Sequence, residues 1–314
     1  MTLSDILPLS YHKLPVHLKP CFIYMALFPV EYPIPTIRLV RLWLAENLLD
    51  SHCYDIERKR TRRPGETFIL ELADRIVTDM VSWRADGSPK ASQMLTSLYD
   101  MLHLIEMSTG FLHIHATSKS KDENDLDSTK QQQQLPAQPP ERTKIRWLAE
   151  HTNIVTNLNL GHVHSFLSFY MRRGLLIKDI STFLRKMTSE TDYSLLRVLD
   201  LEGVYEPSLQ DLCHLKTLDI KHTNITSLPN SLWKARNLRH LHLNWFYIDL
   251  KKILKAWSNN VMALTQLQTL SRLVIGEVKE NLMRYHMDRL TTLITLKLYL
   301  QSSDTDTSGA QKKQ

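Results

Sequence analysis

Three histidine pairs with the spacing H-x-H are the residues in this sequence that could most directly bind a metal ion. Alternate residues of a β-strand share one face, so each pair could place two imidazole rings on one ion. No third ligand lies at the spacing of a known metal motif, so the sequence predicts surface histidines and no metal site. The pairs are His113 and His115, His162 and His164, and His240 and His242.

Motifs of hydrolytic and nucleotide chemistry are also missing from this sequence. It contains no G-x-S-x-G or H-E-x-x-H segment. None of its eight glycines stands in the G-x-x-x-x-G-K-[ST] loop, whose backbone N–H groups bind phosphates. We therefore expect this chain alone to have no enzyme activity, no catalytic residue and no bound cofactor.

The composition is that of an ordinary globular protein with two or three domains. The chain has 314 residues, 43% of them hydrophobic and 23% charged, and a net charge of +6 that only weakly favours anionic partners. The three cysteines lie far apart, which favours reduced thiols in the cytoplasm or the nucleus. No run approaches the roughly 20 apolar residues of a membrane-spanning helix, so we expect no membrane partner.

The first third of the chain is predicted to fold as three helices followed by a β-hairpin. Apolar residues at helical spacing predict one helix between Leu14 and Pro29 and a second over residues 35–49. The segment from Thr67 begins as a helix and changes to strand-like alternation near residues 76–83, where an Asp-Gly turn follows. In the second helix we expect a buried stripe of Ile37, Val40, Leu44 and Leu48.

This order of elements is typical of a winged helix, a fold whose usual association is with DNA. In the second helix, Arg38 and Arg41 show nothing beyond ordinary surface charge. The basic run over residues 58–63 fits a solvated loop better than a nuclear-import patch. A nuclear, DNA-contacting winged helix is therefore an alternative that depends on this basic run, and nucleic acid is not the expected partner.

Beyond residue 115 the sequence changes to a different architecture. A polar, glutamine- and proline-rich linker over residues 116–144 separates the winged-helix part, residues 1–115, from a repeat part, residues 145–302. Residues 303–314 are expected to be a disordered tail. The fold class is thus α/β, a winged helix followed by a short leucine-rich-repeat solenoid.

The repeat part contains five segments with the spacing L-x-x-L-x-L. Each predicts one short parallel strand whose leucines point into a core that forms only when the repeats stack. The frames are Leu196-Leu199-Leu201, Leu215-Leu218-Ile220, Leu238-Leu241-Leu243, Leu270-Leu273-Ile275 and Leu293-Leu296-Leu298.

The residues between the repeat leucines are expected to line a concave face. We expect the carboxylates among them to be solvated, and an exposed aromatic residue beside mixed charges is typical of a protein-binding surface. A merely solvent-facing role for these strand positions stays open. The candidate protein-binding residues are Asp200, Glu202, Thr217, Asp219, Lys221, His240, His242, Asn244, Trp245, Lys297 and Tyr299.

Residues 9–49 carry a more specific signal, "LSYHKLPVHLKPCFIYMALFPVEYPIPTIRLVRLWLAENLL". This stretch resembles the winged-helix part of the nucleotide-binding domain in plant intracellular immune receptors, the coiled-coil NB-ARC leucine-rich-repeat class of disease resistance proteins. Val30, Glu31 and Asn47 depart from the usual family pattern. In the second half, "IRWLAEHTN", "LLRVLDLEG", "LRHLHLN" and "LTQLQTLSRLVIGE" are similar to successive segments of the family's repeat domain.

The resemblance implies a nucleotide switch that this sequence does not reproduce. In the family, ADP and ATP bind a phosphate loop and a Met-His-Asp motif at the end of the winged helix. The aligned residues here are Met94, Leu95 and Thr96, so the motif is degenerate. We interpret the chain as N-terminally truncated relative to the family, with ADP or ATP not expected as a cofactor.

The resemblance therefore implies a plant defence protein that acts by recognising a protein. The expected partner is a pathogen effector, a guarded host protein or a partner receptor. An ADP/ATP-dependent immune switch whose nucleotide site is completed by another chain is a second alternative. The resemblance does not identify the recognised ligand.

Overall fold

The computed structural model describes residues 11–49, 65–99, 101–102, 112–115, 144–151, 161–169, 195–202, 214–223, 225, 228, 232, 235–243, 264–275 and 290–300. It divides into two compact units, the first made of residues 1–170 and 190–200 and the second of residues 171–189 and 201–314. The basic run 58–63, nearly all of the predicted linker and the predicted tail lie outside the described residues.

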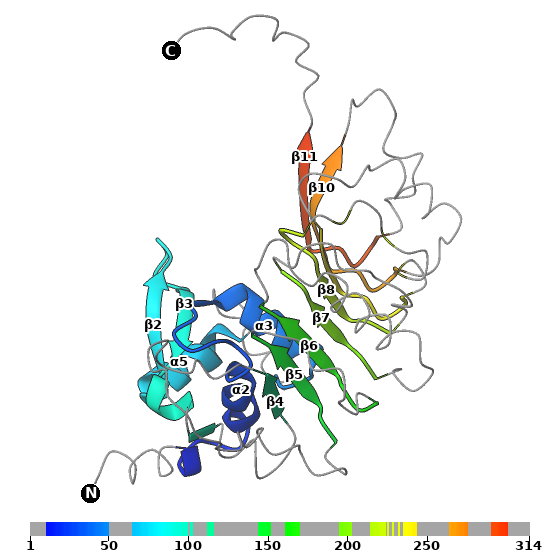
Figure 1. Ribbon diagram of the computed structural model, residues 1–314. Helices are drawn as coiled ribbons and strands as arrows, with labels where there is room; N and C mark the ends of the chain where they lie inside the picture. The colour runs from blue at the N-terminus through cyan, green and yellow to red at the C-terminus, as the bar shows by residue number, and fades with distance from the viewer. Residues whose placement is uncertain are drawn as a thin grey trace, which may run out of the picture. The chain divides into compact units, whose positions relative to one another are not determined.

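Among the described residues, helices α2, α3 and α5 and a small antiparallel sheet lie in the N-terminal part of the first unit (Figure 1). The strand order of this sheet is β1-β3-β2. The predicted helices and hairpin are present, but a strand that the sequence analysis did not predict, β1, lies between α2 and α3 and pairs with β3. They are α2 (Leu18–Met25), β1 (Ile34–Pro35), α3 (Thr36–Ala45), α5 (Glu66–Asp74), β2 (Thr78–Trp83) and β3 (Pro89–Met94).

Two glycines with positive φ determine where elements of this part begin and turn. Gly87 has a φ of 74° in the turn between β2 and β3, where its N–H donates to the carbonyl of Arg84 at 3.0 Å. The predicted Asp-Gly turn is therefore confirmed. Gly65 has a φ of 83° just before α5, and a Cβ atom there would lie 2.8 Å from the side chain of Val40. Both positions favour glycine because other residues rarely adopt this conformation.

Helix α3 is amphipathic, but its buried face differs from the predicted stripe. Ile37 is 48% exposed, whereas Leu39, Leu42 and Trp43 are buried. Arg38 is also buried, and a pattern built on apolar residues leaves such a position out. Val40 of the predicted stripe is buried, and Leu44 and Leu48 are partly buried against the core. The prediction was therefore wrong for Ile37, and it left out the buried Arg38.

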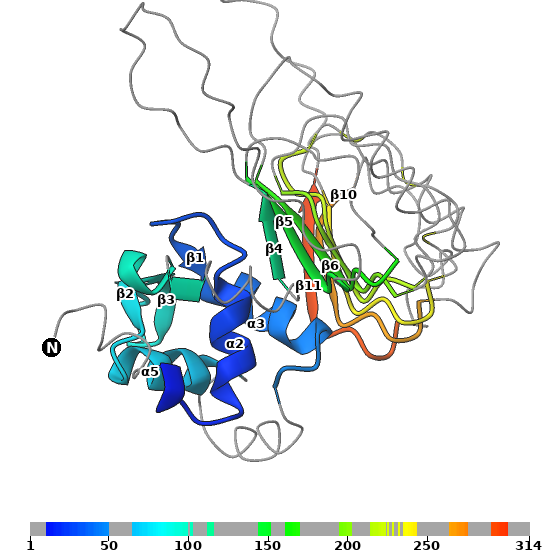
Figure 2. The ribbon, with the colours of Figure 1, turned by 60° about the horizontal axis from the view of Figure 1, so that its bottom comes forward.

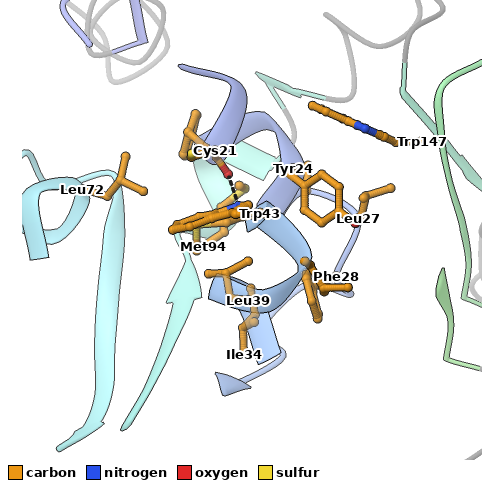
Figure 3. Packing of buried hydrophobic residues seen from close by; sticks show 14 of the residues in the cluster. Cys21, Tyr24, Leu27, Phe28, Ile34, Leu39, Trp43, Leu72, Met94 and Trp147 are labelled. Atoms are coloured by element: carbon orange, nitrogen blue, oxygen red, sulfur yellow. Dashed lines mark hydrogen bonds between the residues drawn. The ribbon is translucent and has the colours of Figure 1, made fainter. Parts of the chain in front are cut away.

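The stretch "CFIYMALF" is the centre of the first unit's core (Figure 3). Its aromatic and aliphatic side chains pack against Leu39 and Trp43 of α3, and the indole N–H of Trp43 donates to the carbonyl of Cys21 at 3.1 Å. Tyr24 meets Trp147 edge to face with 4.9 Å between the ring centroids. The interpretation of this stretch as a core segment is confirmed.

The first unit also contains parallel strands, which lie beside α2 and α3 (Figure 2). The order is β4-β5-β6-β7, with Leu112 opposite Trp147, Trp147 opposite Ser165 and Ser165 opposite Val198. Residues 112–115, which the sequence analysis placed with the winged helix, thus form β4 and pair with β5, at the start of the predicted repeat part over residues 145–302. These strands are β4 (Leu112–His115), β5 (Trp147–Glu150), β6 (Ser165–Ser168) and β7 (Val198–Asp200).

The second unit contains four more parallel strands in the order β8-β9-β10-β11. Their registers place Leu218 opposite Leu241, Leu241 opposite Leu270 and Leu270 opposite Leu296. The α/β fold class is therefore confirmed, with parallel pairing in both units. These strands are β8 (Thr217–Asp219), β9 (His240–His242), β10 (Thr269–Ile275) and β11 (Thr295–Leu300).

The first three predicted leucine frames are buried, but the fourth is displaced by three residues. Leu270 was predicted as the first leucine of its frame, whereas its pairing with Leu241 makes it the middle one, preceded by Leu267. Leucines recur every three residues from Leu264 to Leu273, so the sequence fits two frames. The third position of the observed frame is Arg272, whose φ of 66° coincides with a register shift against β11.

The L-x-x-L-x-L pattern did not identify two further strands, β5 and β6, because their sequences lack the full set of leucines. In β5 the equivalent buried residues are Ile145 and Leu148, and in β6 they are Val163 and Phe166. Leu148 pairs with Phe166, and Phe166 with Leu199 of the first predicted frame. The core column therefore extends through rows whose middle residue is not always leucine.

We predict that Leu241→Ala lowers the free energy of unfolding by about 2–5 kcal/mol, because it empties a fully buried site. The matched control is Leu296→Ala in the same column, where the side chain is 41% exposed and the loss should be clearly smaller. Urea unfolding of the full chain measures both. Equal losses in the two variants would contradict the stacked column.

Candidate functional site

The predicted binding residues differ in exposure from what the sequence led us to expect. Glu202 and Lys221 are partly exposed and Lys297 is exposed. Asn244, Trp245 and the side chain of Tyr299 lie outside the described residues. The expectation of solvent-facing side chains is wrong for Asp200, Thr217, Asp219, His240 and His242, all of which are buried.

Asp200 is buried because it forms an ion pair with Arg38 inside the first unit. The guanidinium donates to both carboxylate oxygens, at 2.8 Å and 2.9 Å, and a third N–H donates to the hydroxyl of Tyr32 at 3.0 Å. The rings of Phe28 and Phe169 lie 5.5 Å and 5.4 Å from the guanidinium carbon. This Arg38 cluster connects α3 to β7 through bidentate, charge-assisted bonds between groups that are 3% and 1% exposed.

Sequence reasoning missed the Arg38 cluster for a physical reason. Arg38 and Asp200 lie 162 residues apart, and each alone has the composition of an ordinary surface charge. The available signal was indirect. Arg38 lies four residues after Ile34 and four before Leu42, both of which are in the core. This spacing places Arg38 on the same side as two core residues, so its side chain is expected to be buried.

A second polar cluster surrounds Glu46 at the carboxyl end of α3. The hydroxyl of Ser165 on β6 donates to the carboxylate at 2.6 Å, and the hydroxyl of Tyr24 donates to Ser165 at 3.0 Å. Arg146 lies 3.4 Å and His164 3.7 Å from the second carboxylate oxygen. This Glu46 cluster thus also connects α3 with strands of the first unit.

The pKa values of two groups in the Glu46 cluster are shifted in opposite directions. Burial alone would raise the pKa of the Glu46 carboxyl, but contacts with His164, Ser165 and Trp147 outweigh it and lower the pKa. Burial, followed by the charge of Glu46, raises the pKa of the Tyr24 hydroxyl well above its usual value. Glu46 is therefore held as a carboxylate and Tyr24 as a neutral hydroxyl donor.

Charged side chains of the second unit form a network at the ends of the strands. The Lys221 ammonium lies 2.9 Å from Glu202 and 3.1 Å from Asp219. His222 lies 3.8 Å from Glu202 and 3.3 Å from Arg272, and burial, followed by the charge of Arg272, lowers the His222 pKa. Lys221 is therefore bound by two carboxylates, and His222 by a carboxylate and a guanidinium.

The histidine pair of β9 bonds to hydroxyl groups of the neighbouring strand. His240 Nδ1 lies 3.1 Å from the Thr269 hydroxyl, and His242 Nδ1 lies 2.6 Å from the Ser271 hydroxyl. These bonds run along the register between β9 and β10. Both rings are thus used in strand-to-strand contacts.

The degenerate Met-His-Asp positions lie where β3 ends and a helical segment begins. Met94 is buried and is the last residue of β3, Leu95 is half-buried, and Thr96 is exposed at the start of the helical residues 96–99. The first residue of the motif thus contributes to the core. Leu95 has no polar side-chain atom, so it cannot bind a phosphate by a hydrogen bond.

We predict that Arg38→Gln lowers the free energy of unfolding by about 3–5 kcal/mol, because it leaves the buried Asp200 carboxylate without its charge partner. Arg41→Gln on the same helix, whose guanidinium donates to its own helix at Ile37, should cost less than about 0.5 kcal/mol. The double variant Arg38→Met, Asp200→Leu should cost less than Arg38→Gln. A larger loss in the double variant would show that the ion pair is not the cause.

We predict that Glu46→Gln destabilises the fold most near neutral pH. Because the folded-state pKa lies below the unfolded value of about 4.3, the ionised carboxyl stabilises the fold above that pH. This contribution is lost as the pH falls through the folded pKa, so the difference from the unsubstituted chain should shrink toward pH 3. Urea unfolding at several pH values measures it, with Asp79→Asn on exposed β2 as the control at pH 7. A difference that grows on acidification would contradict this prediction.

None of the helices in the described part of the chain has the length and apolar character needed to span a membrane. No family model matches the chain. Its similarity to known proteins therefore comes from comparison with individual relatives.

Those relatives are plant disease resistance proteins. The chain is 28% identical over 251 residues to the probable disease resistance protein RF45 of Arabidopsis thaliana, covering 78% of this chain and 22% of that protein. It is 29% identical over 255 residues to the disease resistance RPP8-like protein 3 of Arabidopsis thaliana, covering 76% and 24%. It is 27% identical over 290 residues to the putative late blight resistance protein homolog R1B-16 of Solanum demissum, covering 86% and 22%. The chain thus spans about a quarter or less of the length of these relatives. As the resemblance of residues 9–49 indicated, the chain is a homologue of plant disease resistance proteins.

Proposed function

We propose that this chain takes part in plant defence by recognising another protein through a leucine-rich-repeat surface. In this proposal the helices and hairpin of the first unit are the winged helix of an NB-ARC domain, and the parallel strands are leucine-rich repeats. Support comes from the similarity to disease resistance proteins together with one observation, the parallel rows with buried apolar residues in register. Such rows are the unit of a repeat array.

The proposed recognition surface consists of positions in the strands and directly after them that retain exposed polar groups. In the second unit Glu202 and Lys221 are partly exposed, and Lys297 on β11 is exposed. We include the predicted positions Asn244, Trp245 and Tyr299. His240 and His242 are buried, and their bonds to the Thr269 and Ser271 hydroxyls would hold β9 and β10 in place for this surface.

The proposal assigns the chain no catalytic or nucleotide-binding role, and it places its action in the cytoplasm or the nucleus. A nucleotide switch would require a phosphate loop, and none of the eight glycines of this sequence stands in one. A DNA-contacting role would require a free face on α3. Arg38 of that helix is engaged by Asp200, and Arg41 donates to the carbonyl of Ile37, so neither observation favours DNA.

Expression of the full chain in leaf tissue tests the proposal. We expect it to change the extent of cell death after pathogen challenge, and we expect Lys221→Glu combined with Lys297→Glu to remove most of this effect, because both charges lie on the proposed surface. The matched control reverses two exposed charges elsewhere, Lys90→Glu and Arg236→Glu.

The control pair should behave as the unsubstituted chain does at equal protein abundance. A response that the unsubstituted chain leaves unchanged would overturn the proposed role in defence. An equal loss of effect in the two charge-reversed variants would overturn the assignment of the surface.

A further inference from the structure

The turn between β2 and β3 contains a serine followed directly by a proline, Ser88 and Pro89. This is the only Ser-Pro or Thr-Pro pair in the sequence. Ser88 is partly exposed, and residues 85–87 before it are exposed. A proline favours an extended backbone at the residue before it. An accessible hydroxyl on an extended residue before proline is the acceptor that proline-directed protein kinases use.

Two charged side chains bind the Ser88 hydroxyl. It donates to the Asp86 carboxylate at 2.6 Å, and the Arg84 guanidinium donates to its oxygen at 2.8 Å. The backbone N–H of Ser88 also donates to Asp86, at 2.9 Å. A guanidinium this close to the serine oxygen is within reach of the oxygens of a phosphate bonded to that same atom, and it binds such groups strongly. A phosphate at Ser88 would therefore find a cationic partner already in place.

The same nitrogen of Arg84 also binds a buried carboxylate. Its Nη1 atom lies 2.8 Å from Glu66 Oε1, and Glu66 is the first residue of α5. The guanidinium thus connects the hairpin with the start of α5. A serine phosphate carries about two negative charges near neutral pH, so it would compete with the single charge of Glu66 for this guanidinium. It would also repel Asp86, which loses the hydroxyl donor of Ser88.

We propose that Ser88 is a phosphorylation site for a proline-directed protein kinase, and that its phosphate draws Arg84 away from Glu66. In the transfer, Ser88 Oγ bonds to the γ-phosphorus of Mg-ATP while the bond from that phosphorus to the β-phosphate oxygen breaks. ADP leaves with the electron pair of that bond, and a carboxylate of the kinase accepts the hydroxyl proton. The inference does not depend on the proposed recognition surface, because all of its residues lie in the first unit.

The residues around Ser88 select this class of kinase. Kinases that recognise basic substrates need arginine close before the acceptor, at positions that Asp86 and Ala85 occupy here. Kinases that recognise acidic substrates need a carboxylate shortly after the acceptor, where this chain has Lys90 and Ala91. Pro89 is therefore the feature near Ser88 that a kinase can recognise.

The kinase must reach Pro89 as well as the serine hydroxyl. Pro89 is buried, and it lies opposite Trp83 where the pairing of β2 with β3 ends. The N–H of Arg84 donates to the carbonyl of Ser88 at 2.9 Å, which closes the turn. The end of a hairpin opens locally at a lower cost than the whole fold. We therefore expect the folded chain to be phosphorylated more slowly than a peptide of the same sequence, but at the same residue.

The test incubates the full chain with a proline-directed kinase and Mg-ATP and locates the phosphate by mass spectrometry of peptides. We expect phosphate on Ser88, at a rate that Pro89→Ala lowers by at least about tenfold. A synthetic peptide over residues 82–94 shows that the kinase is active, and a kinase specific for basic substrates is the control. Phosphorylation of the peptide without phosphorylation of Ser88 in the full chain would overturn the proposal. Equal rates with the two kinases would overturn the assigned class.

Amide exchange of the phosphorylated chain tests whether the phosphate takes Arg84 from the helix. Exchange over residues 69–72 of α5 should become about tenfold faster on phosphorylation of the unsubstituted chain. The increase should be absent in Arg84→Gln, which has no guanidinium to lose, and smaller in Glu66→Gln, which has no charge to leave behind. An equal increase in all three chains contradicts the competition for the guanidinium.

Phosphorus NMR reports the contact between phosphate and guanidinium directly. A neighbouring cation stabilises the dianion, so the second pKa of the phosphate should be higher in the phosphorylated variant that lacks this guanidinium, Arg84→Gln, than in the unsubstituted chain. Arg75→Gln removes an exposed guanidinium that pairs with Glu71 on α5, and it should leave the phosphate titration unchanged. Identical titrations in all three phosphorylated chains would show that the phosphate does not bind Arg84.

Discussion

The burial of Arg38 with Asp200 is the constraint on which the arrangement of the first unit depends. A guanidinium and a carboxylate with almost no solvent contact retain little stability unless both charges and most of their hydrogen-bonding groups are satisfied. The bidentate bond and the contact with Tyr32 do this only when α3 and β7 are in one relative position. Apolar contacts are less directional, so the ion pair restricts the placement of α3 against β7 more closely than they do.

Glu46 extends the same constraint to the other end of α3. It follows the last helical residue and bonds to Ser165, which also accepts from Tyr24 of α2. One helix is thus attached to the strands at both ends, by a cation in its first turn and an anion after its last. Between them Leu39, Leu42 and Trp43 contribute the apolar area. The charges fix position, and the apolar residues supply most of the free energy.

Local patterns predicted the elements of this chain better than they predicted its polar contacts. The core stretch from Cys21 to Phe28, the Asp-Gly turn at Gly87 and three of the leucine frames follow from spacing and turn chemistry alone. The fourth frame was wrong because leucines at every third position satisfy two registers, and only pairing with β9 selects one. The Arg38 cluster could not be predicted, since its partners are distant in sequence and each resembles a surface residue.

The residues between the leucines of each frame differ between the two units, so the expectation of a single concave face was too simple. In the first unit these residues include Trp147 and Val198 before the middle core residue and Ala149 and Leu167 after it, all within the core that α2 and α3 share.

In the second unit the two positions that are equivalent within the leucine frame are polar, with Thr217, His240 and Thr269 at one and Asp219, His242 and Ser271 at the other. The residue type at equivalent positions therefore changes between the units. Positions that pack against helices are apolar or paired as Asp200 is, and positions that bond along the strands are hydroxyls and histidines. The equivalent positions of the first unit already form its core, so the surface that we propose for recognition uses positions of the second unit.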